Sequence, residues 1–275
     1  MKSQTSTFEN KAGLKIFTRT WLPDEASKGI IIFTHGFNSH SAYFQWSAEQ
    51  FTAQNYAVYA LDQQGRGQSE GERFYTDNIY DAVADVDFVV DLAKNEHPNL
   101  PTFILGHSAG GVLACLYALE HQEKLSGLIS ESFAFKVPAP EFALAVLKGL
   151  SHIAPHLHTI KLKNEDFSRN PEAVAIMNND PLIADESEPS KSMEQLVKAD
   201  DRLEKEFPLI TLPVFILHGT ADKAAKPSGS QFFFDNAGST DKTIKFYDGH
   251  YHDLLNDLDK EIVMTDIIDW VKKHS

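Results

Sequence analysis

The sequence predicts an α/β fold with a mostly parallel central sheet, flanked by helices and interrupted by a helical lid insertion. Short runs of apolar, β-branched residues alternate with longer segments of helical periodicity, which is the pattern of consecutive βαβ units. The alternation stops at about residue 132 and resumes at about residue 209. We therefore expect a core built from residues 1–131 and 209–275, and a lid or cap formed by residues 132–208.

Several apolar runs have the length and composition of strands. Residues 29–34 and 57–61 are almost continuously apolar, as expected for parallel strands that are buried on both faces. Residues 14–21 alternate between polar and apolar and predict an early antiparallel strand. Further strands are expected at residues 102–105, 128–130, 214–217 and 243–247.

Helical periodicity follows most of these strands. Apolar residues between positions 77 and 96 recur at helical spacing and form a stripe that would face the sheet. Further helices are expected at about residues 109–121, 228–236 and 259–273. Several prolines are spread through residues 132–208, so the elements of the insertion are not assigned individually.

Composition and charge narrow the classes of partner. The chain has 275 residues, of which 42% are hydrophobic and 23% are charged, as in an ordinary globular protein. A formal net charge of −14 repels phosphate backbones, so we expect no nucleic-acid partner. The single cysteine, Cys115, lies in an apolar helical run and cannot form an intramolecular disulfide. The histidines and carboxylates show no metal-ligand spacing, so we predict no metal and no other cofactor.

The sequence also carries signals about location. Residues 1–7 lack the apolar stretch of a signal peptide, and no apolar run approaches the ~20 residues that a membrane span requires. We therefore expect a cytoplasmic protein, with peripheral contact at a membrane left open. The choice between monomer and dimer is left open as well.

The strongest chemical signal is a serine between a predicted strand and a predicted helix. Residues 106–111 read Gly-His-Ser-Ala-Gly-Gly, which places Ser108 in a G-x-S-x-G pattern. A tight strand-to-helix turn lifts the serine hydroxyl clear of the sheet, and the small flanking residues let strand and helix approach closely. The Ala109 N–H at the start of the helix is then free to receive an oxyanion. The alternative is a glycine-rich turn with an incidental serine.

A base and an acid are expected at the same edge of the sheet. Asp222 follows the predicted strand at 214–217, and His252 follows the strand at 243–247. Because the carboxyl ends of parallel strands meet at one edge, both side chains should approach Ser108. His252 would then act as the general base, and Asp222 would orient its imidazole.

Other residues compete for these roles. His250 lies two residues before His252 and would point to the opposite side of an extended segment. Asp248 and Asp253 are alternative acids that we expect to be solvated instead. We expect ordinary surface or core positions for His121, His152, His156 and His158.

The second oxyanion donor should follow the buried strand at 29–34. Gly36 allows the backbone to turn close to the site, which would leave the Phe37 N–H pointing inward. His35 is expected to brace this loop through hydrogen bonds, and it is also a candidate for substrate contact.

Several ordered motifs over nearly the whole chain resemble the monoacylglycerol lipase and lysophospholipase group of α/β-hydrolases, of the serine aminopeptidase S33 type. Each motif occurs in the family order along the chain. They are His35-Gly36, the glycine-rich loop 62–71, the elbow 106–111, Ser168-Arg169-Asn170, 179–182, 219–222 and 249–252. The resemblance implies an α/β-hydrolase fold and a Ser108–His252–Asp222 catalytic triad.

Two positions depart from the family pattern. Arg66 stands where histidine is usual, and we interpret this as a neutral loop change. Tyr43-Phe44 stands where monoacylglycerol lipases often have arginine followed by an aromatic residue. Ester hydrolysis is therefore a firmer expectation than recognition of a glycerol headgroup.

The resemblance implies two-step acyl transfer on medium-to-long acyl esters, such as monoacylglycerols or lysophospholipids. Two other functions remain open: a peptidase or amidase on the same scaffold, and a non-catalytic binding protein. Dehalogenase and epoxide-hydrolase relatives carry aspartate at the elbow, where this chain has Ser108.

The apolar helical segment 141–148 has two interpretations. It forms either an acyl-chain entrance that rests on a lipid surface or a packing face against the domain below. Under the first interpretation, the candidates for substrate contact are His35, His107, Phe142, Leu144 and Leu147.

Overall fold

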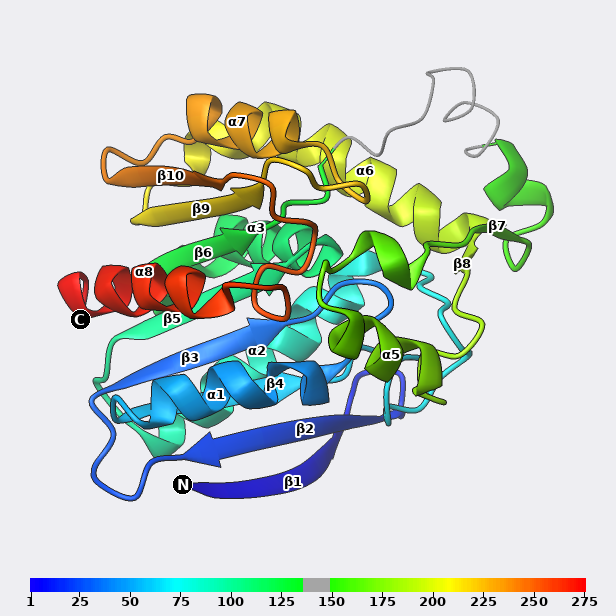
Figure 1. The fold of residues 1–275 in the computed structure, drawn as a ribbon. Helices are drawn as coiled ribbons and strands as arrows, with labels where there is room; N and C mark the ends of the chain where they lie inside the picture. Colours follow the sequence, from blue (N-terminus) through cyan, green and yellow to red (C-terminus); the bar gives the residue numbers. More distant parts are fainter. Residues whose placement is uncertain (136–148) are drawn as a thin grey trace.

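An eight-stranded sheet runs through the centre of the molecule (Figure 1). The computed structural model describes residues 1–135 and 149–275. In chain order the strands of this sheet are β1 (Lys2–Glu9), β2 (Lys15–Leu22), β3 (Gly29–Thr34), β4 (Tyr56–Leu61), β5 (Thr102–His107), β6 (Gly127–Glu131), β9 (Val214–Gly219) and β10 (Lys242–Tyr247). Their spatial order is β1-β2-β4-β3-β5-β6-β9-β10. β2 pairs antiparallel with β1 and β4, and every pair from β4 to β10 is parallel, which confirms the predicted mostly parallel sheet.

Helices cover both faces of this sheet (Figure 1). One face packs against α2 (Ile79–Glu96), α3 (Ala109–His121), α6 (Ser190–Glu206) and α7 (Pro227–Asn236). The other face packs against α1 (Gln45–Thr52) and α8 (Lys260–Lys273). The sheet is therefore the middle layer of three, with a hydrophobic core on each side.

Strand β3 shows why the central strands are continuously apolar. Ile30 and Ile32 belong to the core beneath α2 and α3, whereas Ile31 and Phe33 belong to the core beneath α1 and α8. All four side chains are fully buried. Successive side chains of a strand point to opposite faces, so a strand covered on both faces needs apolar residues at every position.

The segment between β6 and β9 lies outside the large sheet. It contains β7 (His158–Ile160), the short helix η3 (Asn164–Asp166), α5 (Pro171–Asn179), β8 (Glu188–Pro189) and α6. Met193, Leu196 and Leu203 of α6 are buried in the same core as α3. The end of the predicted lid thus packs on the core, and the division at residues 132 and 208 stays a prediction. The candidate contacts Phe142, Leu144 and Leu147 lie outside the described residues.

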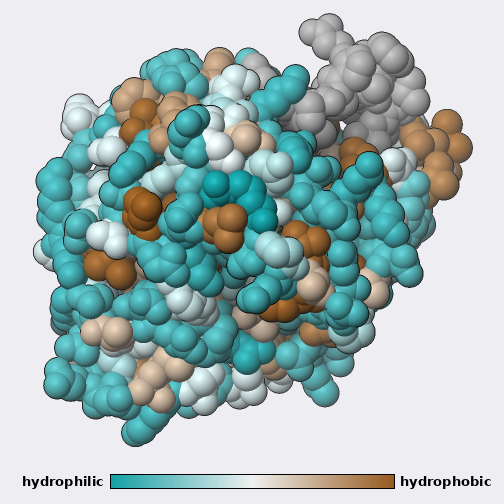
Figure 2. Space-filling model, viewed as in Figure 1, coloured by the Kyte–Doolittle hydropathy of each residue, from teal (hydrophilic) through white to brown (hydrophobic). Residues whose placement is uncertain are grey.

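The face of the molecule that Figure 2 draws is largely polar. Figure 2 shows a mostly hydrophilic face with scattered hydrophobic side chains, in keeping with a net charge of −14. Within the two ranges that the structure describes, no helix has the length and hydropathy needed to cross a bilayer.

A buried carboxyl group on α2 makes the stability of this fold depend on pH. Asp85 is 4% exposed, and its Oδ2 accepts a 3.4 Å hydrogen bond from Asn10 Nδ2. Burial raises the pKa of Asp85 to about 6. The folded protein therefore holds a proton that the unfolded chain has released, and stability falls as the pH rises from about 4 to about 6.

We expect Asp85→Asn to be more stable than the wild type at pH 8, by roughly 1–3 kcal/mol, because the amide removes the cost of ionising a buried carboxyl group. Urea unfolding at pH 5 and pH 8 measures the difference. The advantage of the variant should shrink at the lower pH, and an advantage that does not change with pH would contradict this assignment.

Candidate active site

Ser108 occupies the turn between β5 and α3, the strand–turn–helix context that the sequence predicts. Its backbone has φ 58° and ψ −123°, a strained conformation for a residue with a side chain. The neighbouring glycines allow the close approach that this turn requires. A Cβ on Gly106 would lie 2.3 Å from the Gly110 carbonyl oxygen, and a Cβ on Gly110 would lie 2.1 Å from that of Thr34.

The structure brings Ser108, His252 and Asp222 into one hydrogen-bonded row. His252 Nε2 lies 2.8 Å from Ser108 Oγ, and His252 Nδ1 lies 2.7 Å from Asp222 Oδ2. Asp222 follows β9, and His252 follows β10, at the sheet edge where β5 ends. Ser108 and His252 are 5% and 1% exposed, so water competes little for these contacts. Because Asp222 accepts a hydrogen bond from Nδ1, the proton of the neutral ring lies on Nδ1. The lone pair of Nε2 then faces the serine hydroxyl.

Asp222 is held from several sides. Its Oδ1 accepts hydrogen bonds from the Ala224 and Ala225 amides at 2.8 and 2.9 Å. Its Oδ2 lies 2.9 Å from Nε2 of His218, in addition to His252. Burial by itself would raise the pKa of Asp222, but the two imidazoles hold that pKa well below its ordinary value. The carboxylate therefore stays ionised and fixed in orientation.

His218 is a member of the site that the sequence reasoning missed. It is fully buried at the end of β9, and its Nδ1 lies 2.7 Å from Ser230 Oγ of α7. The available signal was its place four residues before Asp222, at the end of a buried strand. Sequence alone did not show that this ring points at the same carboxylate as His252.

The predicted oxyanion donors lie on the two segments beside Ser108. A Cβ on Gly36 would lie 2.7 Å from Ser108 Cβ, so the loop that carries Phe37 passes directly against the nucleophile. Ala109 is the first residue of α3, where backbone N–H groups have no partner within the helix. The two segments that carry the predicted donors therefore lie beside the serine, and the donor role of the two amides stays a prediction.

His35 and His107 lie behind the site and are not among the pocket-lining residues. Nδ1 of His35 bonds to the Gly36 carbonyl oxygen at 2.8 Å, and its Nε2 accepts from the Gln63 amide at 2.9 Å. Burial lowers the pKa of His35 to about 4 and that of His107 to about 3, so both rings are neutral at pH 7. His35 therefore braces the loop, as the sequence predicts, and has no free ring nitrogen for substrate.

The interpretation of Arg66 as a neutral loop change was wrong. Arg66 is 2% exposed and pairs with Glu186 and, at 2.6 Å, with Glu188. Its guanidinium lies 4.5 Å from the centroid of the Phe37 ring, and Glu186 Oε1 accepts the Asn38 N–H at 2.8 Å. A buried ion cluster therefore ties the Phe37 loop to the segment before α6.

An apolar pocket opens beside the serine. Ser108 and His252 line one part of it, and its other lining residues within the described ranges are apolar. Those residues are Phe37, Ala134, Phe135, Ile160, Leu162, Met193, Leu196, Ala224 and Ala225. Such a pocket suits a hydrocarbon chain that is joined to a group held at Ser108.

Comparison with known families decides what kind of protein carries this geometry. A family model described as serine aminopeptidase, S33 matches residues 25–259. The chain belongs to this serine aminopeptidase S33 family. A monoacylglycerol lipase of Mycolicibacterium smegmatis is 29% identical over 98% of this chain and 96% of the relative. Human monoglyceride lipase is 34% identical over 97% of this chain and 89% of its own length.

The solved structures agree with these sequence relatives. A monoacylglycerol lipase of Paleococcus ferrophilus superposes with a TM-score of 0.84 at 29% identity, with complete coverage of both chains. The predicted family resemblance and the predicted α/β-hydrolase fold are thereby confirmed. The lipase relatives also confirm the predicted enzyme class, a carboxylic ester hydrolase.

We expect Arg66→Met to lower the free energy of unfolding of this S33-family chain by about 3–5 kcal/mol, because it leaves the buried Glu186 and Glu188 side chains without their cation. Urea denaturation at pH 7 measures the loss. The matched control is the triple variant Arg66→Met, Glu186→Gln, Glu188→Gln, which removes the charges together and should recover at least half of the loss. Equal stability of Arg66→Met and the wild type would contradict the buried cluster.

Proposed function

We propose that this protein hydrolyses long-chain acyl esters of the monoacylglycerol type through an acyl-enzyme intermediate on Ser108. The observation that carries the proposal is the 2.8 Å contact between Ser108 Oγ and His252 Nε2 at the mouth of an apolar pocket. The names of the lipase relatives support the choice of substrate.

In the first half-reaction, Ser108 Oγ attacks the ester carbonyl carbon while His252 Nε2 takes the hydroxyl proton. The charge that develops on the imidazole is stabilised by Asp222, which stays ionised beneath it. The carbonyl oxygen becomes an oxyanion and accepts the Phe37 and Ala109 amides. When the tetrahedral intermediate collapses, His252 gives its proton to the departing alcohol.

In the second half-reaction, water replaces the alcohol. His252 takes a proton from this water, which attacks the acyl carbonyl, and the same two amides receive the second oxyanion. Collapse returns the proton to Ser108 and releases the fatty acid. The protein thus needs no group beyond its own side chains and backbone for either step.

The pocket favours an ester over an aminopeptidase substrate. An aminopeptidase must hold the positive α-ammonium group of its substrate, and a buried charge requires a partner of opposite sign. The lining residues that the structure describes include Ser108, His252 and apolar side chains, but no carboxylate. Each methylene of a fatty acyl chain would instead gain about 0.8 kcal/mol on entering such a pocket.

The described residues say less about which alcohol the ester carries than about its acyl chain. Tyr43, which stands where the family resemblance leads us to expect arginine, donates its hydroxyl proton to Asp180 Oδ2 at 3.0 Å. His40 Nε2 lies 2.8 Å from the same oxygen. Tyr43 is therefore engaged within the protein, so the proposal includes lysophospholipids beside monoacylglycerols.

Exposed apolar side chains on the predicted lid support contact with a lipid surface. Ile153, Leu157 and Ile176 are 86%, 51% and 63% exposed. Exposed apolar side chains are unfavourable in water. Burial among the acyl chains at the surface of a membrane would remove that unfavourable contact. We include this contact in the proposal as the route by which the ester reaches the pocket.

Replacing Ser108 or His252 with alanine should lower kcat on a p-nitrophenyl ester by roughly 10⁴-fold, because the nucleophile and its base act as a unit. A fluorophosphonate probe should label the wild type and leave Ser108→Ala unlabelled. His250→Ala is the matched control for the base and should keep at least about a tenth of the wild-type kcat. Near wild-type turnover by Ser108→Ala would refute the mechanism.

Asp222→Asn should fold normally and lose about 10³–10⁴-fold in kcat, because an amide can donate to His252 Nδ1 and hold the wrong tautomer. Asp248→Asn, the alternative acid, should stay within about threefold of the wild type, since its carboxylate bonds to Thr220 at the surface. Steady-state kinetics on one ester compare the two variants. A larger loss in Asp248→Asn than in Asp222→Asn would reverse the assignment.

A further inference from the structure

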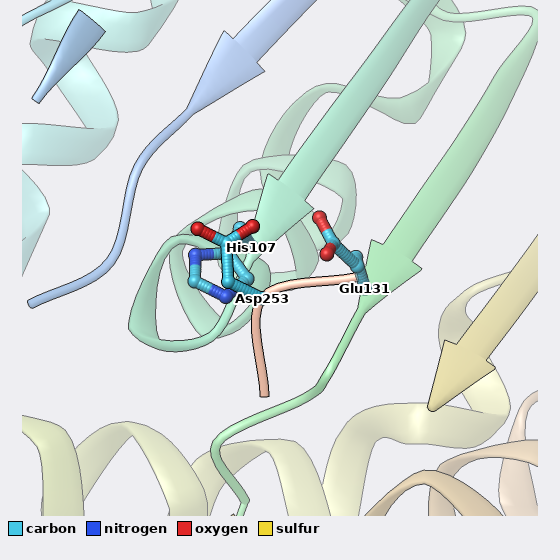
Figure 3. A group of neighbouring side chains, drawn as sticks. All are labelled: His107, Glu131 and Asp253. Atoms are coloured by element: carbon cyan, nitrogen blue, oxygen red, sulfur yellow. The ribbon is translucent and has the colours of Figure 1, made fainter. Parts of the chain in front are cut away.

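Three titratable side chains that the mechanism does not use are clustered behind the catalytic residues (Figure 3). His107 precedes Ser108, Asp253 follows His252, and Glu131 is the last residue of β6. One ligand-type atom of each side chain lies within 4.8 Å of the other two. The three residues are only 3%, 8% and 0% exposed, respectively. Figure 3 shows them converging from the ends of β5 and β6 and from the loop after β10.

Glu131 connects the nucleophile turn to the loop that carries the base. Its backbone carbonyl accepts the Ser108 N–H at 2.9 Å. Its side-chain Oε1 accepts the Leu255 N–H at 3.3 Å, and the Leu254 amide also donates to this carboxyl group. Leu254 and Leu255 are themselves buried in the core beneath α8. A single residue therefore contacts both segments whose separation sets the Ser108–His252 distance.

The surroundings disfavour a charge on Glu131. Its neighbours with titratable groups are Asp253, Asp222, His107, His252 and Tyr247. Both carboxylate oxygens of Asp253 accept hydrogen bonds from Asn256 Nδ2, at 3.1 and 3.0 Å. Glu131 Oε2 has no hydrogen-bond partner among the residues that the structure describes. Burial, together with the neighbouring Asp253 carboxylate, raises the pKa of Glu131 well above its ordinary value. Burial also raises the pKa of Asp253, but the Asn256 hydrogen bonds oppose that rise. Between the two carboxyl groups, Glu131 is therefore the one that keeps a proton.

We propose that Glu131 is a positioning residue: its carboxyl group binds the Leu254 and Leu255 amides and so holds the His252 loop against the nucleophile turn. Ionised Glu131 would face Asp253 as a second negative charge, and the repulsion would separate the loop from β6. A small displacement of the base is costly, because misplacing a reacting group by ~1 Å can lower a rate by about 10²-fold. This inference rests on the proposed function of Ser108 and His252.

The test compares Glu131→Gln, which keeps the shape and the acceptor oxygen without a charge, with Glu131→Leu, which removes the acceptor. In Glu131→Leu, kcat should fall about 10²-fold with less than about threefold change in KM. Glu131→Gln should keep kcat within about threefold at pH 7. The wild type should lose kcat at alkaline pH as Glu131 ionises, and Glu131→Gln should lack that loss.

Glu9→Gln, an exposed change on β1, is the control and should reproduce the wild-type pH profile. A cooperative urea transition for each variant separates loss of folding from loss of position, and Glu131→Gln carries the test alone if Glu131→Leu does not fold. Wild-type kcat in Glu131→Leu would overturn the proposal. A Glu131→Gln variant as slow as Glu131→Leu would also overturn it. So would one mole of zinc per mole of purified protein by elemental analysis, because the cluster would then be a metal site.

Fluorophosphonate labelling of each Glu131 variant distinguishes failure of the Glu131 proposal from failure of the proposed function of Ser108. If Ser108 is the nucleophile and Glu131 is irrelevant, every variant labels at the wild-type rate and the label is lost in Ser108→Ala. If Ser108 is not the nucleophile, the label persists in Ser108→Ala whatever stands at residue 131.

Discussion

The hydrogen bond from Ser108 to His252 Nε2 joins two residues 144 positions apart in the chain, and the rest of the site depends on it. It forms because the parallel strands β5, β6, β9 and β10 end at one edge of the sheet in that spatial order. The proposed nucleophile, acid and base (Ser108, Asp222 and His252) each follow one of these strands. Because the carboxyl ends of parallel strands lie at one edge of the sheet, this fold brings together residues that are distant in the chain.

The same edge of the sheet collects an unusual amount of buried charge. Asp222 is stabilised by two imidazoles and two backbone amides, and Arg66 is paired with two glutamates. In our proposal, Glu131 keeps its proton, so it does not repel the neighbouring Asp253 carboxylate. In each case a buried polar group fixes a backbone segment that touches the reacting atoms. Buried polar groups restrict the geometry of their neighbours only when they are paired, so these contacts should be sensitive to substitution.

The sequence predicted the layered fold from local patterns, and it predicted the three residues of the row from strand ends together with the family resemblance. The expected strand at 57–61 is β4 at Tyr56–Leu61, and the expected helix at 259–273 is α8 at Lys260–Lys273. Strand β1 was not predicted, since its side chains are almost all exposed and carry no apolar alternation. It pairs with β2 along its whole length, and backbone pairing of this kind leaves no signal in side-chain hydropathy.

The supporting residues could not be predicted for a different reason. Arg66 finds its partners 120 and 122 residues later in the chain, and no local motif links those positions. His218 and Glu131 end buried strands, where a polar residue signals a function or a partner without saying which. What they contact depends on the three-dimensional packing of the insertion and of the loop after β10.

The most direct test of this account is a crystal structure of the protein inactivated by a long-chain alkyl fluorophosphonate. Phosphorus should be bonded to Ser108 Oγ, with the phosphoryl oxygen about 2.7–3.1 Å from both the Phe37 and the Ala109 nitrogen. The alkyl chain should lie in the pocket between Phe135 and Leu196. An adduct on another residue, or a phosphoryl oxygen turned away from both amides, would contradict it.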